Sequence, residues 1–126
     1  MKLNVIATEK APAAIGPYSQ AIQAGELLFC SGQIALDSLT GEMLHGDAAA
    51  QTERVMANIA AVLAAAGTGF DNVVKTTIFL VDMSDFSAMN EVYGRFFSEC
   101  KPARSTVAVK SLPRGALVEI EVIAKV

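Results

Sequence analysis

Apolar residues alternate with polar ones, or run continuously, in several short segments of the chain, and such segments predict β-strands. Successive strand side chains point to opposite faces of a sheet, so alternation indicates two unlike faces. The predicted strands span residues 2–8, 21–24, 27–34, 73–81, 105–110 and 116–125. Turn-forming residues at 25–26 and 112–115 join neighbouring strands, and residues 37–46 form a polar loop.

Two further segments repeat their apolar residues every three or four positions, which predicts helices. The first is expected to begin after Asp47 as the N-cap and to end at Gly67. Its apolar side chains are Val55, Ile59, Val62, Leu63 and Ala66. The second is expected to begin at Ser84 and to end at Pro102. Its apolar stripe consists of Phe86, Met89, Val92, Tyr93, Phe96 and Phe97.

The predicted elements follow one another in the order β, β, β, α, β, α, β, β. This order predicts one α+β domain over residues 1–126, with both helices covering a single face of a mixed sheet. Alternation in the last strand separates an apolar face from a mixed one. The apolar face consists of Val118, Ile120, Val122 and Ala124, and the mixed face of Leu117, Glu119, Glu121, Ile123 and Lys125.

Arg104 and Glu119 are the residues that could form a site in this sheet. If the last two strands are neighbours, both side chains lie on the face without helices, with opposite charges. A guanidinium can bind a carboxylate through two hydrogen bonds, and a partly desolvated Glu can orient or deprotonate water. Such a pair suits a small carboxylic acid that carries a hydrolysable group. The pattern alone nevertheless favours a solvated sheet face with ordinary charge pairing.

Composition and the lack of targeting patterns change this interpretation in four ways. Hydrophobic residues make up 52% of the 126 residues and charged residues only 18%, so we expect further apolar burial in an oligomer. The net charge of −3 disfavours nucleic acid as a partner. One His and two isolated Cys cannot supply the ligands of a zinc site, so no metal is expected. Without a signal-peptide pattern or a long apolar run, we expect a cytoplasmic protein that is not in a membrane.

Six short segments lie in order along nearly the whole chain: residues 11–20 (APAAIGPYSQ), 31–34 (SGQI), 75–79 (KTTIF), Asn90, 102–105 (PARS), and 112–113 (LP) followed by 118–121 (VEIE). Together they resemble the RidA family, also called YjgF or liver perchloric-acid-soluble protein. The resemblance implies a chorismate-mutase-like α+β fold assembled as a homotrimer. In that assembly the sheets would line a central barrel, and the sites would lie in clefts between subunits.

The resemblance also implies an enzymatic activity, that of a 2-iminobutanoate/2-iminopropanoate deaminase. Such an enzyme hydrolyses the imine or enamine products of PLP-dependent serine and threonine dehydratases to 2-keto acids and ammonia. The family requires neither a metal nor an organic cofactor. The implied partner is therefore a small imino or keto acid.

Matching positions carry the family's functional residues onto this sequence. Arg104 would bind the substrate carboxylate, Glu119 would position water and transfer protons, and Tyr18 would close the pocket. The remaining substrate-binding residues would be Ser31, Gly32 and Asn90. Thr106 stands where many members carry Cys, which leaves the deaminase expectation intact but argues against thiol-dependent behaviour.

Two other functions stay open on the sequence. The same cleft could hold a small carboxylate without turnover, as in a sensor or regulatory protein. An endoribonuclease or translation inhibitor is the weaker alternative, because the chain has no basic face and only one histidine, His45. Glu121 shares the face of Glu119, and we expect it to have a structural or interface role.

Overall fold

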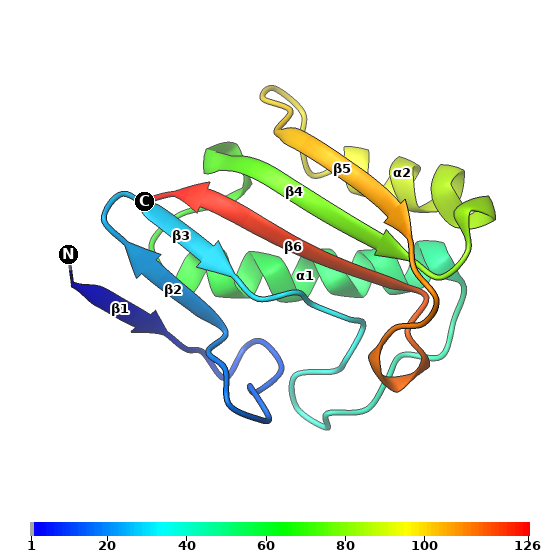
Figure 1. Ribbon diagram of the computed structural model, residues 1–126, viewed down its shortest axis with the longest axis horizontal. Coiled ribbons are helices and arrows are strands. Elements are labelled where there is room, and N and C mark those ends of the chain that lie inside the picture. The colour runs from blue at the N-terminus through cyan, green and yellow to red at the C-terminus, as the bar shows by residue number, and fades with distance from the viewer. Residues whose placement is uncertain (1) are drawn as a thin grey trace.

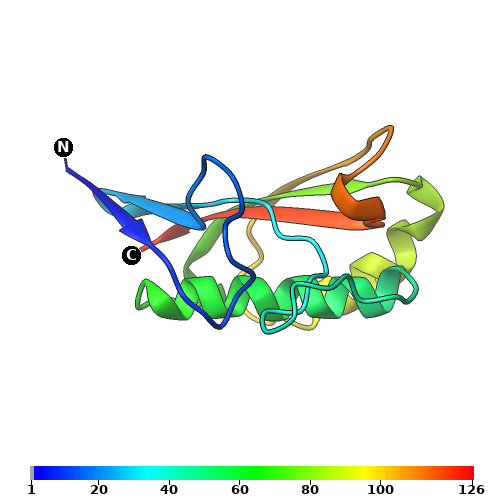
Figure 2. The same ribbon diagram turned by 90° about the horizontal axis from the view of Figure 1, so that it is seen from below.

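The computed structural model describes residues 2–126 and contains one mixed sheet with two helices against one of its faces (Figures 1 and 2). The elements are β1 (Leu3–Ile6), β2 (Ala21–Ala24), β3 (Leu27–Cys30), α1 (Ala48–Ala65), β4 (Val73–Leu80), α2 (Phe86–Gly94), β5 (Ala103–Ala108) and β6 (Val118–Lys125). Short 3₁₀ turns lie at Phe70–Asn72, Met83–Asp85 and Pro113–Gly115. The predicted α+β class, with both helices on one face, is confirmed. Neither helix in residues 2–126 is long and apolar enough to cross a membrane.

The strands lie in the order β1-β2-β3-β6-β4-β5. β6 pairs antiparallel with both β3 and β4, and β5 pairs parallel with β4 (Figure 1). The expectation that the last two strands are neighbours is therefore wrong, because β4 lies between them. The helix α2 forms a crossover that returns the chain parallel to β4, and a parallel neighbour needs such a connection.

The hydrophobic core lies between the sheet and the helices (Figure 2). The predicted apolar face of β6 is buried under them, and so are the apolar residues of α1 at Val55, Ile59, Val62 and Leu63. The opposite sheet face has no covering layer in residues 2–126. Apolar side chains there are exposed, including Leu3, Val5, Leu27, Phe29 and Val107.

Element boundaries differ from the predicted ones at several places. β1 is shorter at both ends, β5 spans Ala103–Ala108 rather than 105–110, and β6 begins at Val118. β3 ends at Cys30, and beyond it only the isolated bridge between Gln33 and Ile120 continues the pairing. The turn before α2 is capped by Asp82, whose carboxylate accepts from the Ser84 backbone N–H, so Ser84 is not the cap. α2 ends at Gly94, and Pro102 instead precedes β5, where its fixed φ suits an extended chain.

The ends of α1 are as predicted. The Asp47 side chain accepts a hydrogen bond of 2.9 Å from the Ala50 backbone N–H. This bond satisfies one of the N–H groups that have no partner within the helix. At the other end, Gly67 has a φ of 78°, a conformation that a residue with a Cβ adopts only at a cost.

Replacing the cap should therefore destabilise the protein measurably. We expect Asp47→Ala to lower the free energy of unfolding by about 1 kcal/mol, measured by urea denaturation. Asp47→Asn keeps an accepting oxygen at the same place and should stay within a few tenths of the wild type. Equal losses in both variants would show that the cap does not stabilise α1.

Candidate active site

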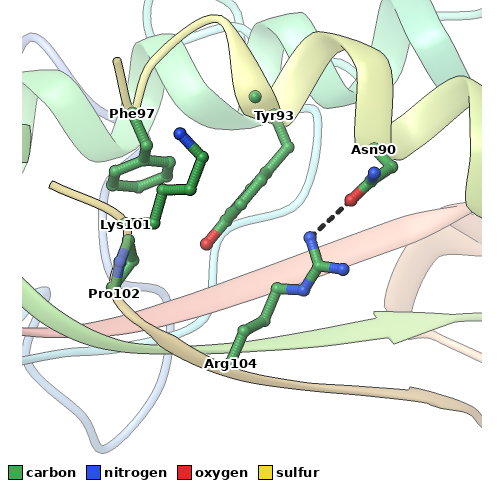
Figure 3. Close-up of a pocket in the computed structure, with 7 residues that line it drawn as sticks. Asn90, Tyr93, Phe97, Lys101, Pro102 and Arg104 are labelled. Atoms are coloured by element: carbon green, nitrogen blue, oxygen red, sulfur yellow. Dashed lines mark hydrogen bonds between the residues drawn. The ribbon is translucent and has the colours of Figure 1, made fainter. Parts of the chain in front are cut away.

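The predicted site residues divide between two cavities. One cavity, of about 300 Å³, lies between α2 and the start of β5 and contains Asn90 and Arg104 (Figure 3). The other, of about 450 Å³, lies beside the loop before β2 and contains Tyr18, Ser31, Gly32 and Glu119 among its lining residues. No group of three or more His, Cys, Asp or Glu side chains in residues 2–126 is placed to hold a metal ion.

In the first cavity, the half-buried Arg104 has only neutral partners. Its Nη1 donates a hydrogen bond of 2.5 Å to the Asn90 Oδ1 (Figure 3). Its Cζ lies 5.0 Å from the ring centroid of Tyr93 and 5.5 Å from that of Phe86. Among residues 2–126, no carboxylate lies within 4 Å of the guanidinium, since the one ion pair joins Arg95 to Glu91. The positive charge of Arg104 is therefore available to an anionic ligand.

Tyr93 is fixed between the helix and the sheet. Its hydroxyl shares a hydrogen bond of 2.8 Å with that of Thr76, and its ring lies 4.7 Å from the Phe97 ring, centroid to centroid. Burial raises the pKa of Tyr93 above its ordinary value, although the hydrogen bond with Thr76 and the charge of Arg104 oppose the shift. The phenol consequently stays neutral beside Arg104.

The second cavity lies where the chain leaves β3 after Cys30. Directly after Cys30, the Ser31 N–H donates to the carbonyl of Gln20 at 2.9 Å, and the Ser31 hydroxyl donates to that of Ser19 at 2.6 Å. These bonds hold the loop that carries Tyr18, whose side chain is 54% exposed at the rim.

Gly32 makes room for the carboxylate of Glu119. A Cβ at residue 32 would lie 2.2 Å from the Glu119 Oε2, a distance that no real contact allows. Glu119 is half-buried, and this burial raises the pKa of its carboxyl above the ordinary value, with repulsion from Glu121 adding to the effect. A carboxylate with a raised pKa can accept a proton from water and return it near neutral pH.

Arg104 and Glu119 lie on opposite faces of the sheet, so the expectation of a shared helix-free face is wrong. Thr76 of β4 pairs with Arg104 on one side and with the buried Val122 on the other, which places Arg104 on the helix-covered face. Glu119 pairs with Phe79, three residues along β4 and thus on the open face. The physical reason is the register of β5 on β4, which places Arg104 beside Thr76 on the face that the helices cover.

Comparisons with known proteins agree with this architecture. A family model described as Endoribonuclease L-PSP matches residues 8–126. The 2-iminobutanoate/2-iminopropanoate deaminase of Mus musculus is 48% identical over 121 residues, which cover 96% of this chain and 90% of the mouse protein. The chain belongs to the endoribonuclease L-PSP family, also called RidA (YjgF).

Solved structures of RidA-family proteins share the whole fold. YyfA of Yersinia pestis, of the conserved Rid protein family, has a TM-score of 0.97 and 51% identity, with 99% of this chain and 100% of that chain covered. E. coli TdcF with bound serine has a TM-score of 0.93 and 40% identity, with 98% of both chains covered. The chorismate-mutase-like fold and the RidA resemblance are thus confirmed.

The contacts of Arg104 with two aromatic rings were not predicted from the sequence of this RidA-family chain. Phe86 and Tyr93 belong to the apolar stripe that we interpreted as core, and Tyr93 is indeed buried. A usable signal was Asn90, a polar residue at helical spacing between them. One face of α2 therefore carries a polar side chain among aromatic ones, which is unusual for a face that only packs.

Thr106 lies two residues after Arg104 on the same strand face. Its Oγ1 is buried and has no hydrogen-bond partner in residues 2–126. An unsatisfied buried hydroxyl costs about 1–3 kcal/mol, whereas an apolar group of the same shape costs nothing there.

The charge of Glu119 should be unfavourable for folding. A raised pKa means that the folded state binds the proton more tightly than the unfolded chain does. The stability that the protonated Glu119 carboxyl contributes is therefore present below the ordinary pKa of about 4.5 and is lost as the pH rises through the raised value. We expect Glu119→Gln to raise the free energy of unfolding at pH 7. By urea denaturation, the gain should shrink as the pH falls toward 4. The exposed Glu53→Gln is the control, and an equal gain in it would contradict the explanation.

Two threonines provide a matched test of the unpaired hydroxyl. We expect Thr106→Val to leave the free energy of unfolding unchanged or to raise it by about 1 kcal/mol. Thr76→Val removes the hydroxyl that bonds Tyr93 and should lower it by about 1 kcal/mol. Thermal or urea unfolding measures both, and similar losses would mean that Thr106 has a partner.

Proposed function

We propose that this protein hydrolyses reactive 2-imino acids, 2-iminobutanoate and 2-iminopropanoate with their enamine forms, to 2-keto acids and ammonia. The observation that carries the proposal is Arg104, a half-buried guanidinium whose partners are all neutral. A planar guanidinium matches a carboxylate through two parallel hydrogen bonds, and every 2-imino acid has such a carboxylate. The name of the mouse relative supports the imine as the reacting group.

In the proposed reaction, Arg104 binds the carboxylate and Glu119 takes a proton from water. The water oxygen forms a bond to the imine carbon, and the electron pair of the C=N π bond moves to nitrogen. Glu119 passes its proton to that nitrogen and gives a carbinolamine. The carbinolamine hydroxyl then gives its proton to Glu119, which passes it to the amino nitrogen; the C–N bond breaks, and ammonia leaves as the C=O bond forms. The raised pKa of Glu119 suits both proton transfers.

We further propose that each site forms between two copies of the chain in a homotrimer. Within one chain, Arg104 and Glu119 face opposite sides of the sheet, so one subunit would supply the carboxylate-binding residue and its neighbour the water-handling residue. The exposed apolar side chains on the open face, such as Phe29 and Val107, support its burial in such an assembly.

The other residues of the second cavity would complete the pocket. Tyr18 would close over the substrate from the loop that Ser31 holds. Gly32 would admit both the Glu119 carboxylate and a ligand close to the backbone. Asn90 would orient Arg104 through its hydrogen bond.

Binding without turnover is the second candidate function. E. coli TdcF is known with bound serine, an amino acid that has a carboxylate but no imine. Arg104 could hold such a ligand in the same way, and Glu119 would then have no proton to transfer. Only a measurement of turnover separates the two functions.

An imine-hydrolysis assay tests the proposed reaction. A PLP-dependent dehydratase would generate the imine from threonine or serine, and semicarbazide would trap whatever survives. We expect the wild type to lower the trapped fraction and Arg104→Ala to reduce kcat/KM about 100-fold, because a charged hydrogen-bonding pair is lost. If the wild type leaves the trapped fraction unchanged but binds 2-oxobutanoate, the binding function holds instead.

Mixed trimers test the shared site. Co-expression of Arg104→Ala and Glu119→Gln chains with different affinity tags allows trimers of both kinds of subunit to be purified. Every such trimer has one junction where intact Arg104 meets intact Glu119, so we expect about a third of the wild-type activity. Each variant alone should have about a hundredth of the wild-type activity or less. Inactive mixed trimers would contradict the division of the site between subunits.

A further inference from the structure

One face of α2 provides every partner of the Arg104 guanidinium. Phe86, Asn90 and Tyr93 follow one another at spacings of four and three, so their side chains project from the same side of the helix. Asn90 accepts the hydrogen bond, and the two rings lie over the guanidinium carbon (Figure 3 shows the first cavity with Asn90, Tyr93 and Arg104). We call Phe86 and Tyr93 the aromatic clamp.

We propose that the aromatic clamp is a pair of positioning residues, which hold the Arg104 guanidinium in the orientation that receives the substrate carboxylate. This inference rests on the function proposed above. The clamp would act on the substrate through Arg104.

The aromatic clamp can stabilise the half-buried charge of Arg104 without neutralising it. A half-buried guanidinium has lost part of its hydration, and an acidic neighbour would usually compensate for it. Such a neighbour would also neutralise Arg104 and compete with the substrate carboxylate. The faces of aromatic rings attract a cation without carrying a negative charge, so they stabilise Arg104 and leave its N–H groups free.

The rigidity of the clamp comes from the same strand that positions Arg104. Thr76 pairs directly with Arg104 in the sheet, and its hydroxyl bonds to that of Tyr93 at 2.8 Å. The Phe97 ring also packs against the Tyr93 ring, with the centroids 4.7 Å apart. The ring and the arginine backbone are thus tied to one position of β4. An arginine side chain with several rotatable bonds gains a fixed orientation from such support.

NMR on the ligand-free protein tests the clamp directly. The Arg104 Nε–H signal, assigned by its absence in Arg104→Lys, should be shifted upfield by ring currents and should show slow rotation of the guanidinium. In Phe86→Leu we expect the signal to move toward the position of exposed arginines, since only the Tyr93 ring remains beside the guanidinium. Phe70→Leu is the matched control, because Phe70 is also half-buried and contacts the rings of Phe96 and Phe97. The control should leave the Arg104 signal in place.

Kinetics connect the clamp to substrate binding. We expect Phe86→Leu to raise KM for the imine about tenfold, with kcat within about threefold of the wild type, since Arg104 grips the ground state and the transition state alike. Phe86→Tyr keeps the ring and should keep a KM close to that of the wild type. Phe70→Leu should lose stability without a change in KM.

The outcomes separate the two proposals. The clamp is overturned if Phe86→Leu and Phe70→Leu give the same Arg104 signal, or if both raise KM to the same extent. A wild type without deaminase activity would refute the proposed function alone. The Arg104 signal would still decide whether the rings hold the guanidinium, and the affinity for 2-oxobutanoate would then replace KM.

Discussion

The pairing of Thr76 with Arg104 is the constraint on which the rest of the site depends. β4 has β5 on one side and β6 on the other, so its own alternation decides which face each neighbouring residue occupies. Thr76 points toward the helices, and so does its partner Arg104. Phe79 and its partner Glu119 point to the open face. A slip of one residue in the β4–β5 register would remove Arg104 from α2.

Both charged residues of the site are held without a neutralising partner in residues 2–126. Arg104 contacts two rings and an amide, and Glu119 lies beside Gly32 with another carboxylate, Glu121, raising its pKa. Folding alone would favour pairing or removing such charges, because desolvated charges are costly. Their retention fits a site whose ligand brings the complementary groups, and stability is commonly lower where function requires it.

The period of the hydrophobic residues was sufficient to predict the local elements. Together with Asp47, Gly67 and the turn residues 25–26, it located α1 with both its ends, the β2–β3 turn and the two faces of β6, because each of these depends on nearby residues alone. The strand order depends on which distant segments meet, and no pattern within β5 distinguishes β4 from β6 as its neighbour. Pro102 was ambiguous for a similar reason, since it can follow a helix or precede a strand.

The face of Arg104 was predicted wrongly because apolar residues occupy both faces of this sheet. Val107 alternates with Arg104, and an apolar residue is ordinarily assigned to the core, which placed Arg104 outside. In the structure Val107 lies on the open face and is exposed. The rule that apolar residues point inward assumes one buried face. The rule fails for a sheet whose second face is also apolar because other subunits cover it, as in the proposed trimer.

The composition of α2 explains how one helix can serve both the core and the site. Met89 and Val92 are buried, while Asn90 projects from the neighbouring side toward Arg104. Tyr93 belongs to both sides, since its ring is buried but faces the guanidinium. Packing of the core thereby sets the position of the residues that hold Arg104. The proposed carboxylate binding would consequently depend on the position of the whole helix, and not only on Arg104.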